Sequence, residues 1–259
     1  MSIPFRGAIA VLYGFIFAPL IVVVLISFNG GTVAAFPIES LSLRWYAQAL
    51  ATDSFIDATI TSLWLAAAAV AISTPIALAA ALGIASGRFR HQVAIEAALL
   101  GPLLIPAIVI GIALLIAFSA TGFRDVPARL VAAHCLIALP YSTRTILASL
   151  SRLDGALGES ARTLGAGEAA VFWHITLPLL RPGIIAGMIF AFLQSFGDVP
   201  ISMFLIDARN NTLPLAIMAY LEYNIDPTVA AISAMVTLAC LALALVLERL
   251  FGLRRALVG

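Results

Sequence analysis

The 259-residue sequence contains no lysine, since all 14 of its basic residues are arginine. A nucleotide-binding loop of the form GxxxxGK(S/T) needs a lysine, so this chain cannot carry one. Only 10% of the residues are charged and the formal net charge is +1, which excludes a nucleic-acid binder with a clustered basic face. The only cysteines, Cys135 and Cys240, lie in apolar runs, which favours packing residues over a disulfide or a metal site.

Apolar residues, in contrast to the scarce charged ones, make up 63% of the chain. One soluble domain cannot keep that share from water, so we expect an all-α, polytopic membrane protein. Six runs reach the roughly 20 apolar residues that a helix needs to cross a bilayer. The predicted spans are 8–28, 59–84, 95–119, 130–150, 182–206 and 229–251, in a single transmembrane domain over residues 1–259. Kinks are expected at Pro102, Pro106 and Pro140, and the first run is expected to stay as a span rather than be cleaved.

The arginines predict the orientation of these spans. If both termini are cytoplasmic, the inner side holds Arg6, Arg88, Arg90, Arg152, Arg162, Arg181, Arg249, Arg254 and Arg255. The outer side then holds Arg44, Arg124, Arg129 and Arg209. Arg144 lies near the inner end of the fourth span and can extend towards the cytoplasm. Since basic residues are enriched in cytoplasmic loops, inner termini are favoured.

Two outer segments have local signals of their own. Trp45, Tyr46 and Leu50 predict a short interfacial helix that anchors the segment after the first span. Asp226 before Pro227 predicts the N-cap and first position of the last span. Glu222 and Asp226 are also candidates for contact with a soluble protein at the outer mouth.

The charged passage 153–183 lies between spans four and five, on the predicted cytoplasmic side. Asp154 is a plausible N-cap of a first short helix, and Gly165 suits a left-handed position that ends it. Residues 168–174 can form a second short helix before Pro178 and Pro182 return the chain to the membrane. Both helices carry apolar side chains that a solvated connector does not need, and a protein partner would cover them. These side chains are Ala161, Leu164, Val171, Phe172 and Trp173.

The spacing within this passage resembles the Glu-Ala-Ala signature of permease subunits in binding-protein-dependent ABC importers. Glu159-Ser160-Ala161 is followed by three residues and Gly165, then by nine residues and Ile175-Thr-Leu177-Pro178. Ser160 replaces an alanine, a change between small residues. The literal triplet at 168–170 lacks the glycine and the Ile-x-Leu-Pro at the required intervals. Together with "SFNGG" after the first span and "SLRWY" before the second, the chain is similar to the second permease of spermidine/putrescine-type importers.

The resemblance implies a type I ABC importer permease fold and a coupling role for residues 154–174. Glu159 would fix the helix and its contact with an ATPase subunit, while Ala161 and Leu164 would enter a groove on it. Gly165 would supply the bend, and Pro178 would set the entry into span five. The implied partners are a second permease, in a heterodimer, two ATPase subunits that hold ATP and Mg, and a soluble binding protein. This chain would bind no cofactor, would not be an enzyme, and would lie in a bacterial cytoplasmic membrane.

Asp198 is the best candidate for the translocation pathway, because an ionisable group within a membrane is costly. It lies about sixteen residues into predicted span five, roughly 24 Å from the inner end. Gln194 and Ser195 lie close to it, and Tyr141 is a weaker candidate nearer the cytoplasm. Asp198 is equally well explained as an internal hydrogen-bond partner or as an ion pair with the companion permease. His134 is interpreted as a residue that hydrogen-bonds between helices.

The substrate is the least determined property. The resemblance favours a polyamine or a related cationic compound, but similar permeases serve aminoethylphosphonate, opine-like compounds and ferric iron. An ion-driven secondary carrier would show internal repeats and paired intramembrane carboxylates, which this sequence lacks. A membrane-embedded enzyme would need a His, Asp or Glu cluster on facing spans, and none is found.

Overall fold

The computed structural model describes residues 3–87 and 90–251; Arg88, Arg254 and Arg255 of the orientation prediction lie outside the described residues. The first helices are α1 (Ile3–Ser27), α2 (Arg44–Ala51), α3 (Asp53–Ala85), α4 (Gln92–Leu100) and α5 (Ala107–Ala120). They are followed by α6 (Val126–Leu150), α7 (Gly155–Thr163), α8 (Glu168–Val171), α9 (Leu177–Phe196), α10 (Leu213–Leu221) and α11 (Thr228–Phe251). Two 3-10 turns, η1 (Gly101–Leu103) and η3 (Ser202–Phe204), and a π-helical segment, η2 (Phe172–Thr176), complete the elements. The all-α prediction is confirmed.

Within the described residues, five stretches of helix are long and apolar enough to cross a membrane, and a bent pair makes a sixth if it counts as one span. The five cover residues 7–27, 53–85, 126–150, 168–196 and 228–246. Four of them agree with predicted spans to within a few residues, because uninterrupted apolar runs of this length form helices in lipid whatever their neighbours are.

The predicted third span is not one straight helix. Residues 92–103 and Ala107–Ala120 meet at an angle of 101°. Pro106 stands at the break, as the N-cap of α5 with φ −54° and ψ 128°. A proline ring disfavours helical backbone in the residue before it, so the break falls where a kink was expected and is far sharper than a kink.

The helix in the place of predicted span five, 182–206, has other ends than the prediction. The helix starts earlier, because Glu168–Phe196 runs through η2 without interruption, and it ends earlier, at Phe196. Proline within a helix clashes with the carbonyl four residues before it, and a π turn widens the helix at that point. The carbonyl four residues before Pro178 belongs to His174, which lies within η2, so the helix passes this proline and the second short helix joins α9 instead of ending before it.

The chain divides into two compact units, whose borders fall within α3, α10 and α11. The first unit contains residues 1–57 and 216–242. In it Asn29 is buried and its side chain accepts hydrogen bonds from the backbone of Gly31 (3.0 Å) and Glu39 (3.2 Å). Trp45 Nε1 donates to the Asn29 carbonyl at 2.7 Å, and Tyr46 bonds Ser27 at 2.6 Å. The aromatic residues of α2 therefore hold the loop that follows α1.

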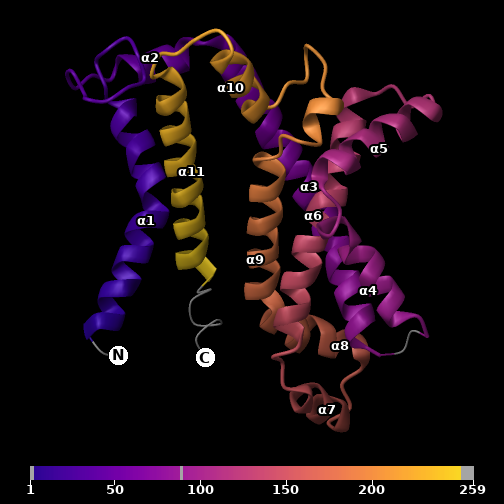
Figure 1. Cartoon of the computed structure of the whole chain (residues 1–259). Coiled ribbons are helices and arrows are strands. Elements are labelled where there is room, and N and C mark those ends of the chain that lie inside the picture. Colours follow the sequence, from indigo (N-terminus) through magenta and orange to yellow (C-terminus); the bar gives the residue numbers. More distant parts are fainter. Residues whose placement is uncertain (1–2, 88–89, 252–259) are drawn as a thin grey trace. The chain divides into compact units, whose positions relative to one another are not determined.

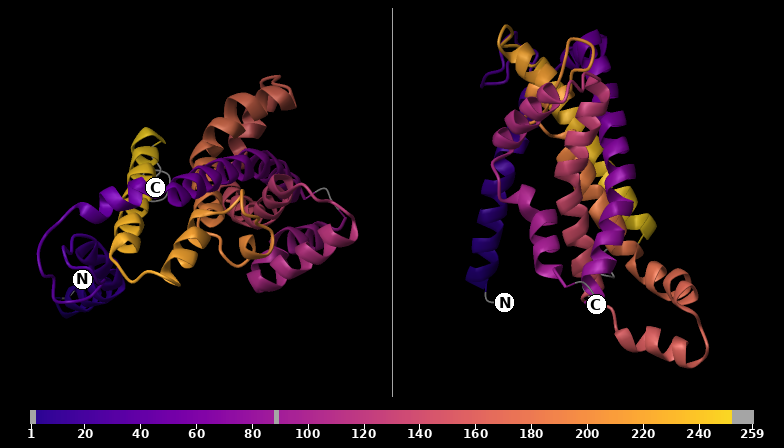
Figure 2. Two further views of the ribbon diagram at one scale, coloured as in Figure 1. Left: turned by 90° about the horizontal axis from the view of Figure 1, so that it is seen from above. Right: turned by 90° about the vertical axis from the view of Figure 1, so that its right-hand side faces the viewer.

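The second unit contains residues 58–215 and the chain from 243 onwards. Its main contact joins α6 and α9, which lie side by side in Figures 1 and 2. A Cβ atom at Gly183 would overlap the side chain of Ser149. Ser142 Oγ donates to the carbonyl of residue 187 at 3.3 Å. Small residues on both helices thus allow the backbones to approach closely, as is common between membrane helices.

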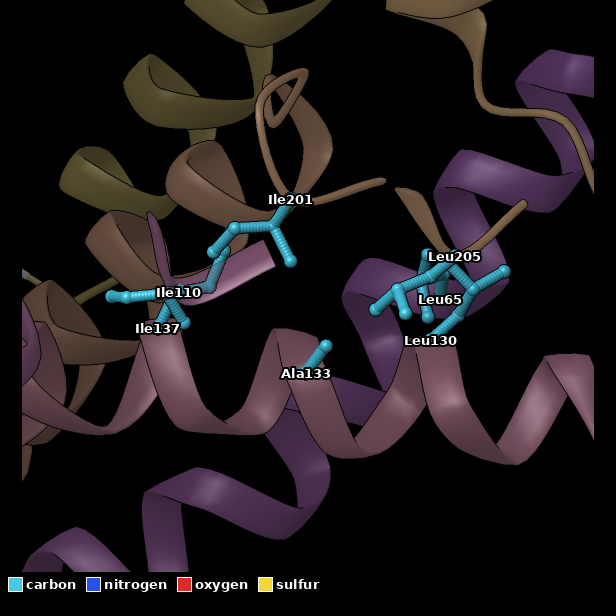
Figure 3. Close-up of a cluster of buried hydrophobic side chains, with 7 residues drawn as sticks. All are labelled: Leu65, Ile110, Leu130, Ala133, Ile137, Ile201 and Leu205. Atoms are coloured by element: carbon cyan, nitrogen blue, oxygen red, sulfur yellow. The ribbon is translucent and has the colours of Figure 1, made fainter. Parts of the chain in front are cut away.

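The same unit contains a buried apolar cluster (Figure 3). It gathers side chains from α3, α5, α6 and the segment after α9. Its members are Leu65, Ile110, Leu130, Ala133, Ile137, Ile201 and Leu205. The chain that leaves α9 at Phe196 is thereby packed back into the unit.

Candidate functional site

The helix α7 begins and ends as the sequence predicts. The Asp154 carboxylate accepts a hydrogen bond from the backbone N–H of Ala156 at 2.9 Å and caps the helix. Gly165 has φ 91°, in the left-handed region. Its N–H donates to the carbonyl of Arg162 at 2.9 Å, and the N–H of Ala166 donates to that of Ala161 at 3.0 Å. This pair of bonds is a Schellman motif, which closes the helix and turns the chain towards α8.

An ion pair joins the two short helices. Arg162 Nε and its terminal nitrogen donate to the two carboxylate oxygens of Glu168 at 2.7 and 3.0 Å. Hydrogen bonding to Glu168 raises the pKa of the Arg162 guanidinium. Glu168 belongs to the triplet that fails the motif spacing, and the sequence indicated only a favourable place for it in the first turn of the second short helix, which agrees with its position as the first residue of α8. The structure places it as a brace across the turn at Gly165.

The apolar surface of this element is concentrated on few side chains. Leu164 is 88% exposed, Trp173 is 62% exposed and Leu157 is 50% exposed. The expectation that Val171 adds to this surface is wrong, because Val171 is 4% exposed. A Cβ atom at Gly158 would lie 3.5 Å from its side chain, so Val171 packs between the two helices. Figure 1 shows α7 and α8 next to each other at one end of the second unit.

The other motif residues surround this element. Glu159 and Ser160 are exposed on α7, and Ala161 is half-buried. Ile175 lies in η2, while Leu177 and Pro178 form the first turn of α9. The motif therefore covers a helix, its cap, the π segment and the start of the membrane helix, in one continuous stretch.

Asp198 is not within a helix, contrary to its predicted place in span five, since α9 ends two residues before it. It is 3% exposed, and its Oδ2 accepts hydrogen bonds from the N–H and the hydroxyl of Ser202, both at 2.8 Å. Ser195 is also buried and bonds His134. The structure thus contains the internal hydrogen bonding that was one of the alternatives for Asp198. Its role in the pathway stays a prediction.

In the described part of the chain, the side chains of the two remaining pathway candidates make no hydrogen bond to Asp198, Ser195 or His134. Gln194 and Tyr141 are half-buried on α9 and α6, respectively. The Tyr141 carbonyl accepts a hydrogen bond from the Thr145 hydroxyl at 2.7 Å, which is local to its own helix.

The two acidic residues predicted to lie at the outer mouth have different surroundings. Asp226 Oδ1 accepts from the N–H of Thr228 at 2.9 Å, so it starts α11 as predicted. Its Oδ2 accepts from the Tyr220 hydroxyl at 2.8 Å. Glu222 is exposed on the turn after α10.

Comparison with known proteins identifies the family. The model of the binding-protein-dependent transport system inner membrane component matches residues 73–253, more than half of the chain. The chain belongs to this family. The permease is therefore a transport subunit of a binding-protein-dependent ABC importer and not an enzyme, and it is a multi-pass component of the inner membrane. The resemblance based on the Glu-Ala-Ala signature is confirmed.

Two curated relatives match nearly the whole permease. It is 30% identical to a spermidine/putrescine transport system permease protein of Haemophilus influenzae, over 90% of each chain. It is 31% identical to a putrescine transport system permease protein of Escherichia coli, over 90% of this chain and 85% of that protein. A crystal structure of a bacterial ABC transporter involved in alginate import matches with a TM-score of 0.70 and 15% identity over 95% of each chain. This structural match shows that the fold is shared.

Proposed function

We propose that this permease is one half of a heterodimeric permease pair, and that α7 and α8 dock on one of two ATPase subunits. ATP and Mg are held by those subunits, since this sequence has no lysine for a nucleotide-binding loop. Both termini and the α7–α8 element lie on the cytoplasmic side, as the arginine distribution favours. A soluble binding protein delivers the substrate on the opposite side, where Glu222 and Asp226 are candidates for contact with it.

The observation that carries this proposal is the exposure of Leu164. A leucine that is 88% exposed, held at the end of a capped helix by a Schellman turn and braced by an ion pair, is shaped for a partner's groove. The helix that begins at Glu168 continues to Phe196 without a break. A force applied by the ATPase at α8 therefore enters α9 directly, and ATP binding and hydrolysis can alternate the access of the pathway.

The Leu164→Asp variant is expected to lose the ATPase subunit. Burying a leucine side chain contributes about 1.5–3 kcal/mol, so removing it and adding a charge should weaken docking by about tenfold to a hundredfold. The measurement is the amount of ATPase subunit that co-purifies with a tagged permease when both are expressed from their neighbouring genes. Leu164→Met is the matched control, because it keeps an apolar side chain of similar volume. Full retention of the ATPase by Leu164→Asp would contradict the docking surface.

We propose that the transported solute is a polyamine. The proposal is supported by the two relatives, which are named as permeases for spermidine and putrescine and match about nine tenths of this chain. Proteoliposomes that hold the permease pair, the ATPase and the binding protein are expected to take up labelled putrescine or spermidine only when ATP is present. Aminoethylphosphonate, an opine and ferric iron are tested as competitors. Uptake blocked by one of these and not by excess polyamine would replace the polyamine assignment.

A further inference from the structure

A buried set of polar side chains joins three elements of the second unit. His134 on α6 is 0% exposed, Ser195 in the last turn of α9 is 3% exposed, and Ser202 in η3 is 0% exposed. Nδ1 of His134 lies 2.7 Å from Ser195 Oγ, and its Nε2 lies 3.0 Å from Ser202 Oγ. Asp198 is the fourth member, because its carboxylate accepts a hydrogen bond from the Ser202 hydroxyl. Buried polar groups in a membrane protein are costly, and these four are satisfied by one another.

For a neutral imidazole, the contacts of Ser202 fix the direction of the hydrogen bonds in this set. The Ser202 hydroxyl has one proton and donates it to Asp198 Oδ2. At its contact with His134 the Ser202 hydroxyl must therefore accept, and Nε2 of the ring must donate. In a neutral imidazole the other nitrogen then accepts, so Ser195 donates to Nδ1. The chain of donors runs from Ser195 through His134 and Ser202 to the Asp198 carboxylate.

The set lies where the membrane helix has ended and the chain turns back. α9 stops at Phe196, and the Asp198 carboxylate accepts the N–H of Ser202, the first residue of η3. Ile201 and Leu205 bury themselves in the cluster of Figure 3 against Leu130, Ala133 and Ile137 of α6. The last two lie next to His134 on α6, one residue before it and three after it. The His134 imidazole thus adds hydrogen bonds to the apolar contact between α6 and the segment that follows α9.

We propose that His134 is a positioning residue of the transport cycle. Its imidazole holds the end of α9 and the segment 198–205 to α6, as a latch. This inference rests on the proposed function, because its consequence concerns coupling. The α7–α8 element moves α9 at its inner end, and α6 moves with α9 because the two helices pack along each other. At the outer end, the latch passes this movement to the segment 198–205. Without the latch, α6 and α9 move and this segment does not follow.

The test compares ATP hydrolysis with transport in the reconstituted complex. His134→Ala is expected to lower polyamine uptake about tenfold while the binding-protein-stimulated ATPase rate stays within about twofold, so more ATP is spent for each solute. A defect that is only one of folding would lower both rates together. An equal loss of both rates therefore overturns the proposal, and so does an increased KM for uptake with an unchanged maximal rate, which indicates substrate contact.

Two amide variants test the direction of the hydrogen bonds. Gln at position 134 can place a donor near the position of Nε2 and reach Ser202, whereas Asn places its amide near Nδ1 and reaches Ser195. Since the segment that holds Asp198 is bound through Nε2, His134→Gln is expected to restore uptake to within about threefold of the wild type, and His134→Asn is not. Equal uptake by the two variants would contradict the latch.

A measurement that does not depend on transport can test the latch separately from the proposed function. Hydrogen–deuterium exchange of a peptide that covers residues 197–206 is expected to be faster in His134→Ala than in the wild type or in His134→Gln. Unchanged exchange overturns the latch even in a working importer. Absence of ATP-driven uptake in the wild type, with the exchange difference present, counts against the proposed function and leaves the latch supported.

Discussion

The Gly183→Ala variant is expected to lose about 1–3 kcal/mol of its free energy of unfolding, because added atoms in a closely packed contact force the backbones apart. The Cβ atom would overlap both Cβ and Oγ of Ser149 on α6. A change of the Ser149 rotamer moves Oγ and leaves Cβ in place, so the helices themselves must move. The measurement is thermal or denaturant unfolding of the purified permease in detergent.

Two further variants show whether the contact with Ser149 is the cause. Gly183→Ala combined with Ser149→Gly removes both overlapping atoms and is expected to recover most of the lost stability. Gly14→Ala is the control in α1, where an added Cβ atom meets nothing within 4 Å. There alanine should be neutral or stabilising by up to about 1 kcal/mol, as in other helix interiors. Equal destabilisation by Gly14→Ala and Gly183→Ala would contradict a specific contact between α6 and α9.

The Gly165→Pro variant is expected to fold and to lose the ATPase subunit. Proline holds φ near −65°, whereas residue 165 has φ 91°, and proline also removes the N–H that bonds the Arg162 carbonyl. The Schellman turn cannot form, so α7 and the Leu164 side chain lose their orientation towards α8. The element is exposed, and therefore the membrane helices should not be affected. Co-purification of the ATPase subunit measures docking, and ATP-driven uptake measures its consequence.

Gly167→Pro is the matched control for this variant. Residue 167 is the N-cap of α8 with φ −73°, which lies within the range that proline adopts. The same substitution two residues further on should therefore retain the ATPase subunit. Loss of the ATPase in both variants would mean that proline disturbs the passage in general, and retention in both would mean that the Schellman turn is not needed for docking.

Much of the candidate site could be predicted because its signals are local. Asp154 caps α7 and Gly165 takes the left-handed conformation, and both depend on a few neighbouring residues. The register of the Glu-Ala-Ala signature also follows from spacing alone. The brace between Arg162 and Glu168 was not predicted, because it forms only once the turn at Gly165 has brought two helices together.

The ends of span five show where local reasoning fails. The apolar run continues past Phe196, and composition alone places the helix end near residue 206. In the structure the chain leaves the helix before Asp198 and packs Ile201 into a cluster formed by α3, α5 and α6. Packing against distant elements outweighs helix propensity, which is a weak preference for any one segment. The same holds for the 101° bend at Pro106, where the sequence indicates a kink and not its size.

By itself, the sequence determined the class of protein, most of the candidate spans and the place of the short helix α7 with its cap and its closing turn. These properties depend on hydrophobic run length, charge distribution and residue spacing, which can be read from the sequence without knowing its tertiary contacts. Only the tertiary structure decided the partners of His134, which bonds residues 61 and 68 positions away. It also decided that α8 continues into α9 and that Val171 is buried. These properties depend on which side chains packing brings together, and no periodicity within one segment encodes that.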